Sequence, residues 1–258
     1  HVAESECSVV IEGPSGTGKE LFAQAIHNLS PRKYGPYIRI NCAALPANLL
    51  ESEFFGYVKG AFTDAKRDKP GKFCLANGGT LLLDEISEMD ISLQVKLLRV
   101  LNNGEYQPLG STKTLRTDAR IIASTNADLQ EAISRGMFRE DLYFRLNVVN
   151  LQIPPLRERP EDIPVLVEHF IKELRKKTSK SIERISLEAI NTLRKHTFPG
   201  NVRELENAIE HAFVMCHNSI IESEHLPINI VNSAGKQKKV VNDNTDDKAL
   251  IEEALYRN

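Results

Sequence analysis

Five short apolar runs, separated by segments of helical periodicity, limit the possible fold of this chain more than any other feature. They are SVVIEG (8–13), YIRINC (37–42), TLLLDE (80–85), RIIAST (120–125) and VVNLQI (148–153). Strands that are apolar along nearly their whole length are buried on both faces, as in a parallel sheet covered by helices. The sequence therefore predicts an α/β fold in which a parallel sheet is flanked by helices.

Two stretches between these runs carry apolar residues at helical spacing, and packing in the core is the simplest explanation of both. The residues are Leu21, Phe22, Ala25, Ile26 and Leu29 in the first stretch, and Val95, Leu98 and Leu101 in the second.

Two further segments do not fit a minimal sheet of this kind. Residues 54–73 mix glycines, aromatic residues and charges where a crossover helix is expected. Residues 103–120 alternate as in a hairpin that turns at Pro108 to Ser111. Insertions of this kind often form functional loops.

Beyond residue 158 the periodicity is purely helical, and a small helical domain is expected there. Its third helix should follow Gly200, with Asn201 as the N-cap and Glu204 three residues later. A polar stretch without periodicity comes next, as in a linker, and a further amphipathic helix then begins. The expected domains are an α/β domain (1–158), a helical domain (159–231), a linker (232–247) and the start of another domain (248–258).

Composition favours a globular protein of a reducing compartment. Of the 258 residues, 41% are hydrophobic and 26% are charged. The formal net charge of -2 gives no global basic field that would attract nucleic acid. The four cysteines form no Cys-x-x-Cys pair, which argues against a zinc site or a disulfide framework. No apolar run approaches the roughly 20 residues that cross a bilayer, so we expect no membrane insertion and a cytoplasmic location.

A glycine-rich segment directly after the first run matches the phosphate-binding pattern of Gly, four residues, Gly and Lys. Gly16 and Gly18 would let backbone N–H groups approach phosphate oxygens, next to a helix N-terminus that favours negative charge. Lys19 would supply a point charge to the β and γ phosphates. The general pattern continues with Ser or Thr as a magnesium ligand, but Glu20 stands here. The expected binding residues are Gly13, Pro14, Ser15, Gly16, Thr17, Gly18, Lys19 and Glu20.

Two adjacent acids, Asp84 and Glu85, end the third apolar run. Carboxylates at the carboxyl end of a strand in an α/β sheet lie where ligands bind. We expect Asp84 to hold Mg²⁺ through water and Glu85 to act as the general base on the attacking water. With the Lys19 loop upstream, the pair predicts nucleotide hydrolysis. A helicase, a transporter ATPase and a GTPase all remain open on these two motifs.

Longer strings occur in the order and spacing of one family over nearly all of residues 2–231. They are GPSGTGKE, NCAAL (41–45), GAFTDA (60–65), GGTLLLDEIS (78–87), STNADL (124–129), FREDLYFRLN (138–147), PPLRERPEDI (154–163) and FPGNVRELEN (198–207). On these strings the chain resembles the central AAA+ domain of bacterial sigma-54-dependent transcriptional activators, which are NtrC-like enhancer-binding proteins. The resemblance implies a AAA+ P-loop NTPase with a small all-helical lid, and ATP with Mg²⁺ as cofactors. Glu is usual at position 20 in that family.

The same resemblance assigns roles to two asparagines. Asn126, with Thr125 beside it, resembles the sensor that reads the γ phosphate. Asn41 resembles the switch residue that holds the Glu85 carboxylate away from water until the target is engaged. From the residues alone, capping of a strand end is the simpler explanation of either asparagine.

Three arginines also gain roles from the resemblance. Arg139 and Arg145 are similar to residues that reach the nucleotide site of a neighbouring subunit, where an arginine finger contributes about 10³ to 10⁵ in rate. Arg203 is similar to a second sensor in the lid. Without the resemblance, Arg139 and Arg145 would simply pair with acids on the helix surface, such as Glu140 and Asp141.

The GAFTDA segment resembles the signature with which this family contacts sigma-54, usually GAFTGA. The resemblance implies a partner-binding loop with an apolar tip at Phe62. Asp64 replaces the second glycine, which removes a backbone option at positive φ and adds a charge. The loop residues are Gly60, Ala61, Phe62, Thr63, Asp64 and Ala65.

The resemblance also implies partners: sigma-54 of RNA polymerase, and other copies of the chain in a hexamer or heptamer ring. DNA contact would belong to a C-terminal helix-turn-helix domain of which residues 248–258 are the start. The leading hypothesis is an ATP-driven motor that remodels the sigma-54 polymerase closed complex so that promoter DNA opens. An alternative is a nucleotide-regulated oligomeric regulator that no longer contacts sigma-54, which Asp64 would explain. A clamp loader or helicase-like protein would share the nucleotide chemistry but not the GAFT loop.

Overall fold

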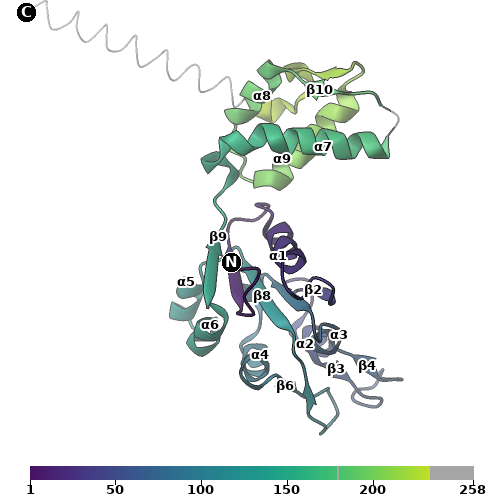
Figure 1. Ribbon diagram of the computed structural model, residues 1–258, viewed down its shortest axis with the longest axis vertical. Coiled ribbons are helices and arrows are strands. Elements are labelled where there is room, and N and C mark those ends of the chain that lie inside the picture. Colours follow the sequence, from purple (N-terminus) through teal and green to yellow (C-terminus); the bar gives the residue numbers. More distant parts are fainter. Residues whose placement is uncertain (179, 233–258) are drawn as a thin grey trace, which may run out of the picture. The chain divides into compact units, whose positions relative to one another are not determined.

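A computed structural model describes every residue of the chain except 179 and 233–258 (Figure 1). The chain divides into two compact units, His1–Ile153 and Pro154–Asn258. This division comes before the PPLRERP stretch, whereas the periodicity placed the boundary after residue 158. The expected linker beyond its first residue and the expected further helix lie outside the described residues.

The five apolar runs form one parallel sheet in the first unit, which confirms the predicted fold class. Its strand order is β2-β5-β8-β1-β9, so that β8 is the central strand. The strands are β1 (Val9–Glu12), β2 (Tyr37–Asn41), β5 (Thr80–Asp84), β8 (Arg120–Thr125) and β9 (Val149–Gln152). β8 pairs in parallel with β5 on one side and with β1 on the other.

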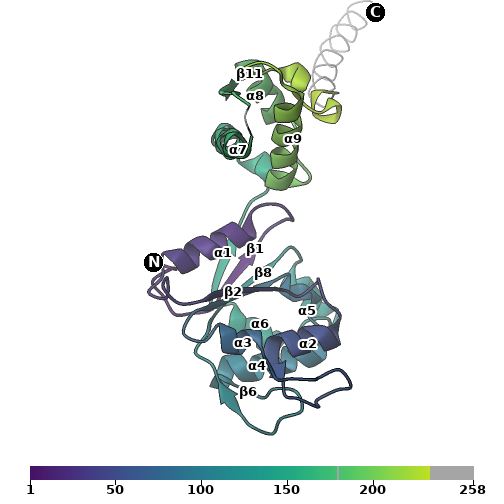
Figure 2. The same cartoon turned by 90° about the vertical axis from the view of Figure 1, so that its right-hand side faces the viewer.

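Helices cover both faces of this sheet (Figure 2). Val9 and Ile11 point to the face that packs against α1 (Lys19–Asn28), whereas Val10 points to the opposite face, as the period of two along a strand requires. The opposite face packs against a larger set of helices. These are α2 (Ala47–Phe55), α3 (Lys72–Leu75), α4 (Ile91–Asn103), α5 (Leu129–Ser134) and α6 (Glu140–Leu146).

α1 buries a stripe that shares only Ile26 with the predicted one. Leu21, Phe22 and Leu29 are 68%, 46% and 73% exposed, and Ala25 is exposed as well. The buried residues are Lys19, Ala23, Ile26 and His27. Because Lys19 begins the helix with its side chain buried, the residues that share its side of the helix face the sheet with it. Val95 of α4 is likewise exposed, against the same expectation.

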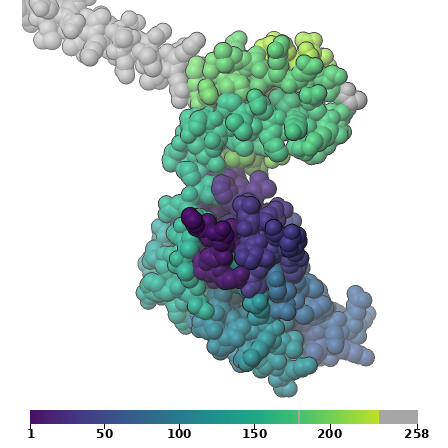
Figure 3. All heavy atoms as spheres, in the orientation of Figure 1, coloured from purple at the N-terminus to yellow at the C-terminus, as the bar shows by residue number. Residues whose placement is uncertain are grey.

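The two insertions form short antiparallel pairs that lie against each other. β3 (Gly56–Tyr57) pairs with β4 (Lys69–Pro70), and β6 (Glu105–Tyr106) pairs with β7 (Leu115–Arg116), as the hairpin prediction requires. The backbone of Leu109, between β6 and β7, bonds to the base of the first pair at Gly56. The connection between β3 and β4, residues 58–68, projects from the body of the first unit and is called loop 58–68 below (Figures 1 and 3).

Within its described residues the second unit packs three α-helices around its own apolar core, but it is not purely helical. A parallel pair of two-residue strands accompanies the helices. The elements are α7 (Ile163–Lys177), α8 (Leu187–Arg194), α9 (Asn201–Met215), β10 (Arg184–Ile185) and β11 (Ile220–Ile221). The core contains four apolar residues of α9, namely Leu205, Ile209, Ala212 and Phe213.

Asn201 is not the N-cap that the sequence predicted. Gly200 takes that position, and Asn201 has a φ of 53° with its side chain buried. Its Oδ1 accepts a hydrogen bond from the Leu156 backbone N–H at 2.9 Å. The Glu204 carboxylate accepts from the Gly200 N–H at 2.8 Å, so the acid still serves the helix start. None of the described helices is both long and apolar enough to cross a membrane.

Candidate nucleotide site

Residues that the sequence singled out follow four strands at one edge of the sheet. The register places Glu12 of β1 beside Thr125 of β8, and Asn41 of β2 beside Asp84 of β5. Parallel strands end at the same edge, and ligands bind at the carboxyl ends of strands in α/β sheets. The glycine-rich loop, the two acids and both asparagines are therefore together at this carboxyl edge.

The glycine-rich loop after β1 needs its glycines. Gly16 and Gly18 have φ values of 78° and 96°, which residues with a side chain adopt at a cost. A Cβ on Gly13 would lie 2.6 Å from the Ile153 carbonyl oxygen, so the close approach of loop and sheet requires glycine there too. The Thr17 hydroxyl donates to the Pro14 carbonyl at 2.9 Å and helps to close the turn before α1.

Lys19 places a buried positive charge directly under this loop. Its side chain is only 6% exposed. Its Nζ donates to the Gly13 carbonyl at 2.9 Å and lies 3.6 Å from Glu85 Oε1. A buried ammonium is costly without such partners. Lys19 thereby links the glycine-rich loop to Glu85, and an anion bound in the loop would contact the Lys19 ammonium.

Both carboxylate oxygens of Asp84 accept hydrogen bonds from neighbouring strands. Ser124 Oγ donates to Oδ1 at 2.6 Å, and Asn41 Nδ2 donates to Oδ2 at 3.0 Å. Asn41 Oδ1 in turn accepts from the Ala43 N–H at 2.9 Å. The Asn41 amide thus bonds to Asp84 here, and not to Glu85 as the resemblance implied, because the strand register sets Asn41 beside Asp84.

Glu85 adopts a strained backbone conformation between β5 and the following turn. Its φ is 53°, a left-handed value that costs free energy for a residue with a side chain. Its Oε2 accepts a hydrogen bond from the Asn126 backbone N–H at 3.0 Å, while Oε1 faces Lys19. The carboxylate is therefore held at the tip of β8, next to the glycine-rich loop.

The end of β8 connects the parts of this edge. The buried Thr125 hydroxyl accepts from the Ala127 N–H at 3.0 Å and lies 3.2 Å from the Ser87 hydroxyl. The Thr125 carbonyl accepts from the Gly13 N–H at 3.2 Å, which ties β8 to the start of the loop. The Asn126 side chain is exposed at the tip of β8.

Glu20 points away from these groups and forms an ion pair with Arg39 of β2. The Ser or Thr that serves as a magnesium ligand in the general motif is thus replaced here by an acid that forms a surface ion pair. Among the residues that the structure describes, no three or more His, Cys, Asp or Glu side chains gather as a metal site. The Asp84 carboxylate, which ends β5 at this edge, is an acid that could hold an ion together with phosphate oxygens and water.

Sequence reasoning missed Ser124 and the environment of Cys42. Ser124 is fully buried, and strand order gave the missing signal: Leu83 pairs with Ala123, so the next residues, Asp84 and Ser124, are neighbours. Burial, together with the negative charges of Asp84 and Glu85, raises the pKa of the Cys42 thiol to about 12. The thiol beneath the edge is thus protonated and unreactive at neutral pH.

Arg139 and Arg145 contact residues outside the carboxyl edge, and Arg203 belongs to the second unit. Arg139, just before α6, makes a two-pronged ion pair with Asp141, with its Nε and terminal nitrogen at 3.0 Å and 2.7 Å from the carboxylate oxygens. This hydrogen bond lowers the pKa of Asp141. Arg145 donates to the Leu101 carbonyl at 3.1 Å and 2.8 Å. Arg203, on α9 of the second unit, is exposed.

Loop 58–68 carries the GAFTDA residues on backbone hydrogen bonds. The Gly60 N–H donates to the Ala65 carbonyl at 2.9 Å, and the Ala65 N–H donates to the Phe62 carbonyl at 3.0 Å. Phe62 is 44% exposed, and its ring packs edge to face on Tyr57 with centroids 4.8 Å apart. Within this loop only Gly60 has a positive φ, so Asp64 adopts an ordinary backbone conformation.

Comparison with known proteins agrees with this geometry. The family described as "Sigma-54 interaction domain" matches residues 1–152, and the family described as "AAA+ ATPase lid domain" matches residues 157–243. The chain is 52% identical to the Nif-specific regulatory protein of Azospirillum lipoferum, over 90% of the chain but only 38% of that protein.

Two further relatives cover nearly all of this chain. The sigma54-dependent transcriptional regulator SfnR of Pseudomonas fluorescens is 46% identical over 99% of the chain and 70% of that protein. The crystal structure of NtrX from Brucella abortus in complex with ATP aligns with a TM-score of 0.82 at 38% identity, over 90% of this chain and 51% of that one. The chain therefore belongs to the sigma-54 interaction domain family, joined to the lid domain of AAA+ ATPases.

Proposed function

We propose that this chain is an ATP-hydrolysing motor domain that acts on the sigma-54 form of RNA polymerase. The observation that carries the nucleotide chemistry is the buried Lys19, which bonds to the Gly13 carbonyl at 2.9 Å and faces Glu85 at 3.6 Å. A cation, a strand-end carboxylate and a left-handed glycine loop converge there as phosphoryl transfer requires. The crystal structure of NtrX in complex with ATP supports the same ligand for this chain.

The residues of the carboxyl edge have separable tasks in this proposal. ATP would be the substrate, and a Mg²⁺ ion held near Asp84 would supply positive charge to its phosphate oxygens. Lys19 binds the β and γ phosphates. Asp84, fixed by Ser124 and Asn41 through its two oxygens, has free lone pairs for water molecules of the ion's shell. Glu85 would accept a proton from the water that attacks the γ phosphorus, as the bond from that phosphorus to the departing ADP breaks, and Asn126 at the tip of β8 would contact the γ phosphate.

The arginines complete the site from a second copy of the chain. Arg139 and Arg145 are bound here to Asp141 and to the Leu101 carbonyl, so each must exchange that partner for a phosphate oxygen. A guanidinium binds phosphate with two parallel hydrogen bonds, which compensates for the lost contact. In this proposal hydrolysis takes place in a ring, hexameric or heptameric, because each site needs the arginines of a neighbour. Arg203 would report the γ phosphate to the second unit.

Loop 58–68 is the proposed point of contact with sigma-54. Its exposed Phe62, seated on Tyr57, offers an apolar tip at the end of a projecting segment. Asp64 adopts no left-handed conformation, so the substitution of the usual glycine introduces a charge without backbone strain. These two observations favour a working loop.

The added charge of Asp64 also gives a second candidate its basis: a nucleotide-regulated oligomeric regulator that does not engage sigma-54. Promoter opening separates the two candidates. Opening of a sigma-54 promoter by the purified chain with ATP is expected from the motor, measured by permanganate footprinting. Hydrolysis without opening, and opening restored by Asp64→Gly, would support the second candidate.

Hydrolysis itself is tested by its dependence on protein concentration. Because the arginines belong to a neighbour, phosphate release per chain should rise as the chain is concentrated and assembles. A chain that fails to bind ATP, measured by fluorescence of a labelled nucleotide, would exclude both candidates. Activity per chain that stays constant across assembly would contradict the shared site alone.

A further inference from the structure

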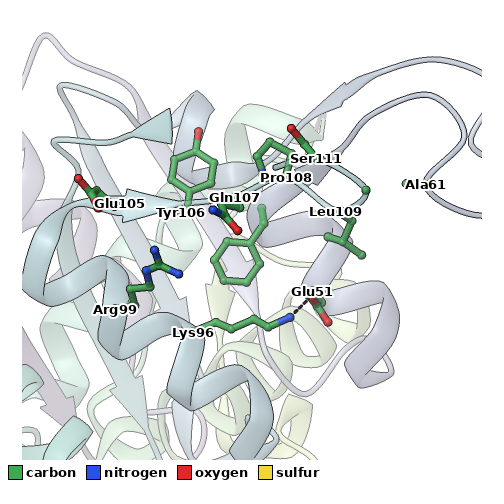
Figure 4. A pocket seen from close by; sticks show the side chains of 12 residues that line it. Glu51, Ala61, Lys96, Arg99, Glu105, Tyr106, Gln107, Pro108, Leu109 and Ser111 are labelled. Atoms are coloured by element: carbon green, nitrogen blue, oxygen red, sulfur yellow. Dashed lines mark hydrogen bonds and ion pairs between the residues drawn. The ribbon is translucent and has the colours of Figure 1, made fainter. Parts of the chain in front are cut away.

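A pocket of about 360 Å³ opens at the base of loop 58–68 (Figure 4). Its walls come from the end of α2, from one side of α4, and from β6 with the segment that follows it. The loop itself contributes Ala61, and the segment after β6 contributes Leu109 and Gly110. One wall of the pocket is therefore the segment that we assign to partner contact.

The pocket and the loop cannot move independently at this wall. A Cβ on Gly110 would lie 2.7 Å from the Ala61 Cβ, and Gly110 has a φ of 75°, so only glycine fits between the two segments. The Val58 N–H donates to the Leu109 carbonyl at 3.1 Å, at the root of the loop. A group that enters the pocket thus touches the loop and the segment that supports it at once.

The floor of the pocket is apolar. Phe55 and Tyr106 are each 4% exposed, and their ring centroids are 6.3 Å apart. Leu109 and Pro108 continue this surface toward the opening. A single aliphatic or aromatic side chain would be desolvated by these residues, and burial of such a side chain contributes about 1.5 to 3 kcal/mol before the costs of association.

The rim of the pocket carries one uncompensated positive charge. Lys96 pairs with Glu51, and Arg116 pairs with Glu105 at 2.8 Å, so both acids of the rim are neutralised. Arg99 forms no ion pair with any residue in the part of the chain that the structure describes. Figure 4 shows Arg99 projecting from the same helix as Lys96, toward the strand that carries Tyr106. The pocket thus combines an apolar floor with a guanidinium that lacks an anion.

We propose that this pocket binds a segment of sigma-54 that carries an apolar side chain next to an acidic one. The apolar side chain would pack against Phe55 and Leu109, and the carboxylate would pair with Arg99. The inference rests on the proposed function, and it adds a second, charged contact to the Phe62 tip. Two factors favour this occupant: the charge complements an acid, and the pocket wall is continuous with the partner loop. Arg99 gives a bidentate site that a lysine would not reproduce.

The test compares Arg99→Ala, Arg99→Lys and Arg99→Glu with the wild type and with Arg135→Ala. Arg135 is a matched control because it is an exposed arginine whose ion pair is with Glu131, outside the pocket. Binding of fluorescently labelled sigma-54 is titrated with ADP and aluminium fluoride present. We expect Arg99→Ala to weaken binding about tenfold, Arg99→Lys less and Arg99→Glu more, while Arg135→Ala stays within about twofold. Raising the salt should weaken the wild type more than Arg99→Ala.

Each other outcome has a distinct meaning. A wild type that does not bind sigma-54 at all contradicts the proposed function, and this inference with it. Unchanged binding by all three Arg99 variants overturns the pocket contact and leaves the motor proposal standing. An equal loss in Arg135→Ala reduces the effect to general charge and overturns it as well. A change in oligomeric state, measured by light scattering, without a change in sigma-54 affinity assigns the pocket to a contact between copies and also overturns it. Basal ATP hydrolysis should be the same in all variants.

Discussion

The carboxyl edge of the sheet and the exposed parts that would act on other chains are built in different ways. At the edge, Lys19, Asp84 and Glu85 are fixed by hydrogen bonds and ion pairs to one another or to adjacent strands. In loop 58–68, backbone hydrogen bonds hold the segment while the side chain of Phe62 stays largely outside the core. Arg139 and Arg145 also use contacts that water or an anion could replace.

In the proposed function, the groups of the carboxyl edge act within one copy of the chain, whereas loop 58–68 and the two arginines act on another chain. Groups that must keep their geometry throughout the reaction are buried or half-buried and have several partners, which limits their motion. Groups that must change partner are exposed, because an exposed ion pair contributes only about 0 to 1 kcal/mol and is released at little cost. Five experiments test this division, ordered by the expected size of their effect on kcat.

Arg139→Ala should have the largest effect on kcat although the residue is exposed. If a neighbour supplies this guanidinium, its loss should lower kcat by about 10³ or more with ATP binding intact. Mixing Arg139→Ala with Glu85→Ala chains should restore part of the activity, because some interfaces then contain both intact groups. Phosphate release across mixing ratios measures this. Absence of rescue at every ratio would place the complete site within one chain.

Glu85→Ala should reduce turnover by about 10² to 10⁴, the range of a general base, while ATP still binds. Lys19→Ala should instead abolish binding, since the charge under the loop is lost. Isothermal titration with ATP and single-turnover hydrolysis separate the two effects. Equal loss of binding in both variants would contradict the role of Glu85 as the base.

Ser124→Ala should lower kcat by about tenfold and raise the Mg²⁺ concentration that gives half-maximal activity. The variant removes the donor at 2.6 Å from Asp84, so the carboxylate is less well oriented. The lost buried hydrogen bond should also cost about 1 kcal/mol in the free energy of unfolding. Thermal unfolding measures stability, and hydrolysis is titrated with Mg²⁺. A loss of stability with unchanged Mg²⁺ dependence would make Ser124 a purely structural residue.

Phe62→Ala should leave basal hydrolysis within about twofold and eliminate the binding of sigma-54 that depends on aluminium fluoride. The side chain is 44% exposed and contacts Tyr57, so its removal should change the free energy of unfolding by less than about 1 kcal/mol. Co-elution with sigma-54 is the measurement, and thermal unfolding is the control. Retained co-elution would remove the loop tip from the contact.

The last experiment leaves hydrolysis unchanged and compares the thiol labelling of a buried cysteine at the carboxyl edge with that of an exposed cysteine. Because its pKa is raised to about 12, Cys42 should stay unlabelled by iodoacetamide from pH 7 to pH 9 in the folded chain. Cys74 is exposed and should react under the same conditions. Mass spectrometry identifies the labelled residue, and labelling in denaturant shows that Cys42 is chemically competent. Early labelling of Cys42 would mean that the edge opens readily.

Much of the fold followed from the order of apolar and polar residues. The five runs became the five strands because strands buried on both faces leave a continuous apolar signature. Gly13, Lys19, Asp84 and Glu85 were placed together because parallel strands end at one edge. These features depend on local sequence and on a general rule of sheet topology, and both can be applied without coordinates.

Other features depend on contacts between segments distant in sequence. The apolar spacing of α1 was evident, but Lys19 turns a different stripe to the sheet and exposes Leu21 and Leu29. Asn41 was linked to Glu85, whereas the register gives it to Asp84. Ser124 carries no motif of its own, and its role appears only once β5 and β8 are known to be neighbours.

The last residues of β8 concentrate three attachments in consecutive positions. Ser124 bonds to the Asp84 carboxylate, the Thr125 carbonyl bonds to the first glycine of the loop, and the Asn126 N–H bonds to Glu85. A displacement of this strand tip by a fraction of an ångström would disturb all three groups simultaneously. The middle strand is thus a common anchor, through which loss of a bound terminal phosphate would reach Asp84, Glu85 and the glycine-rich loop in a single step.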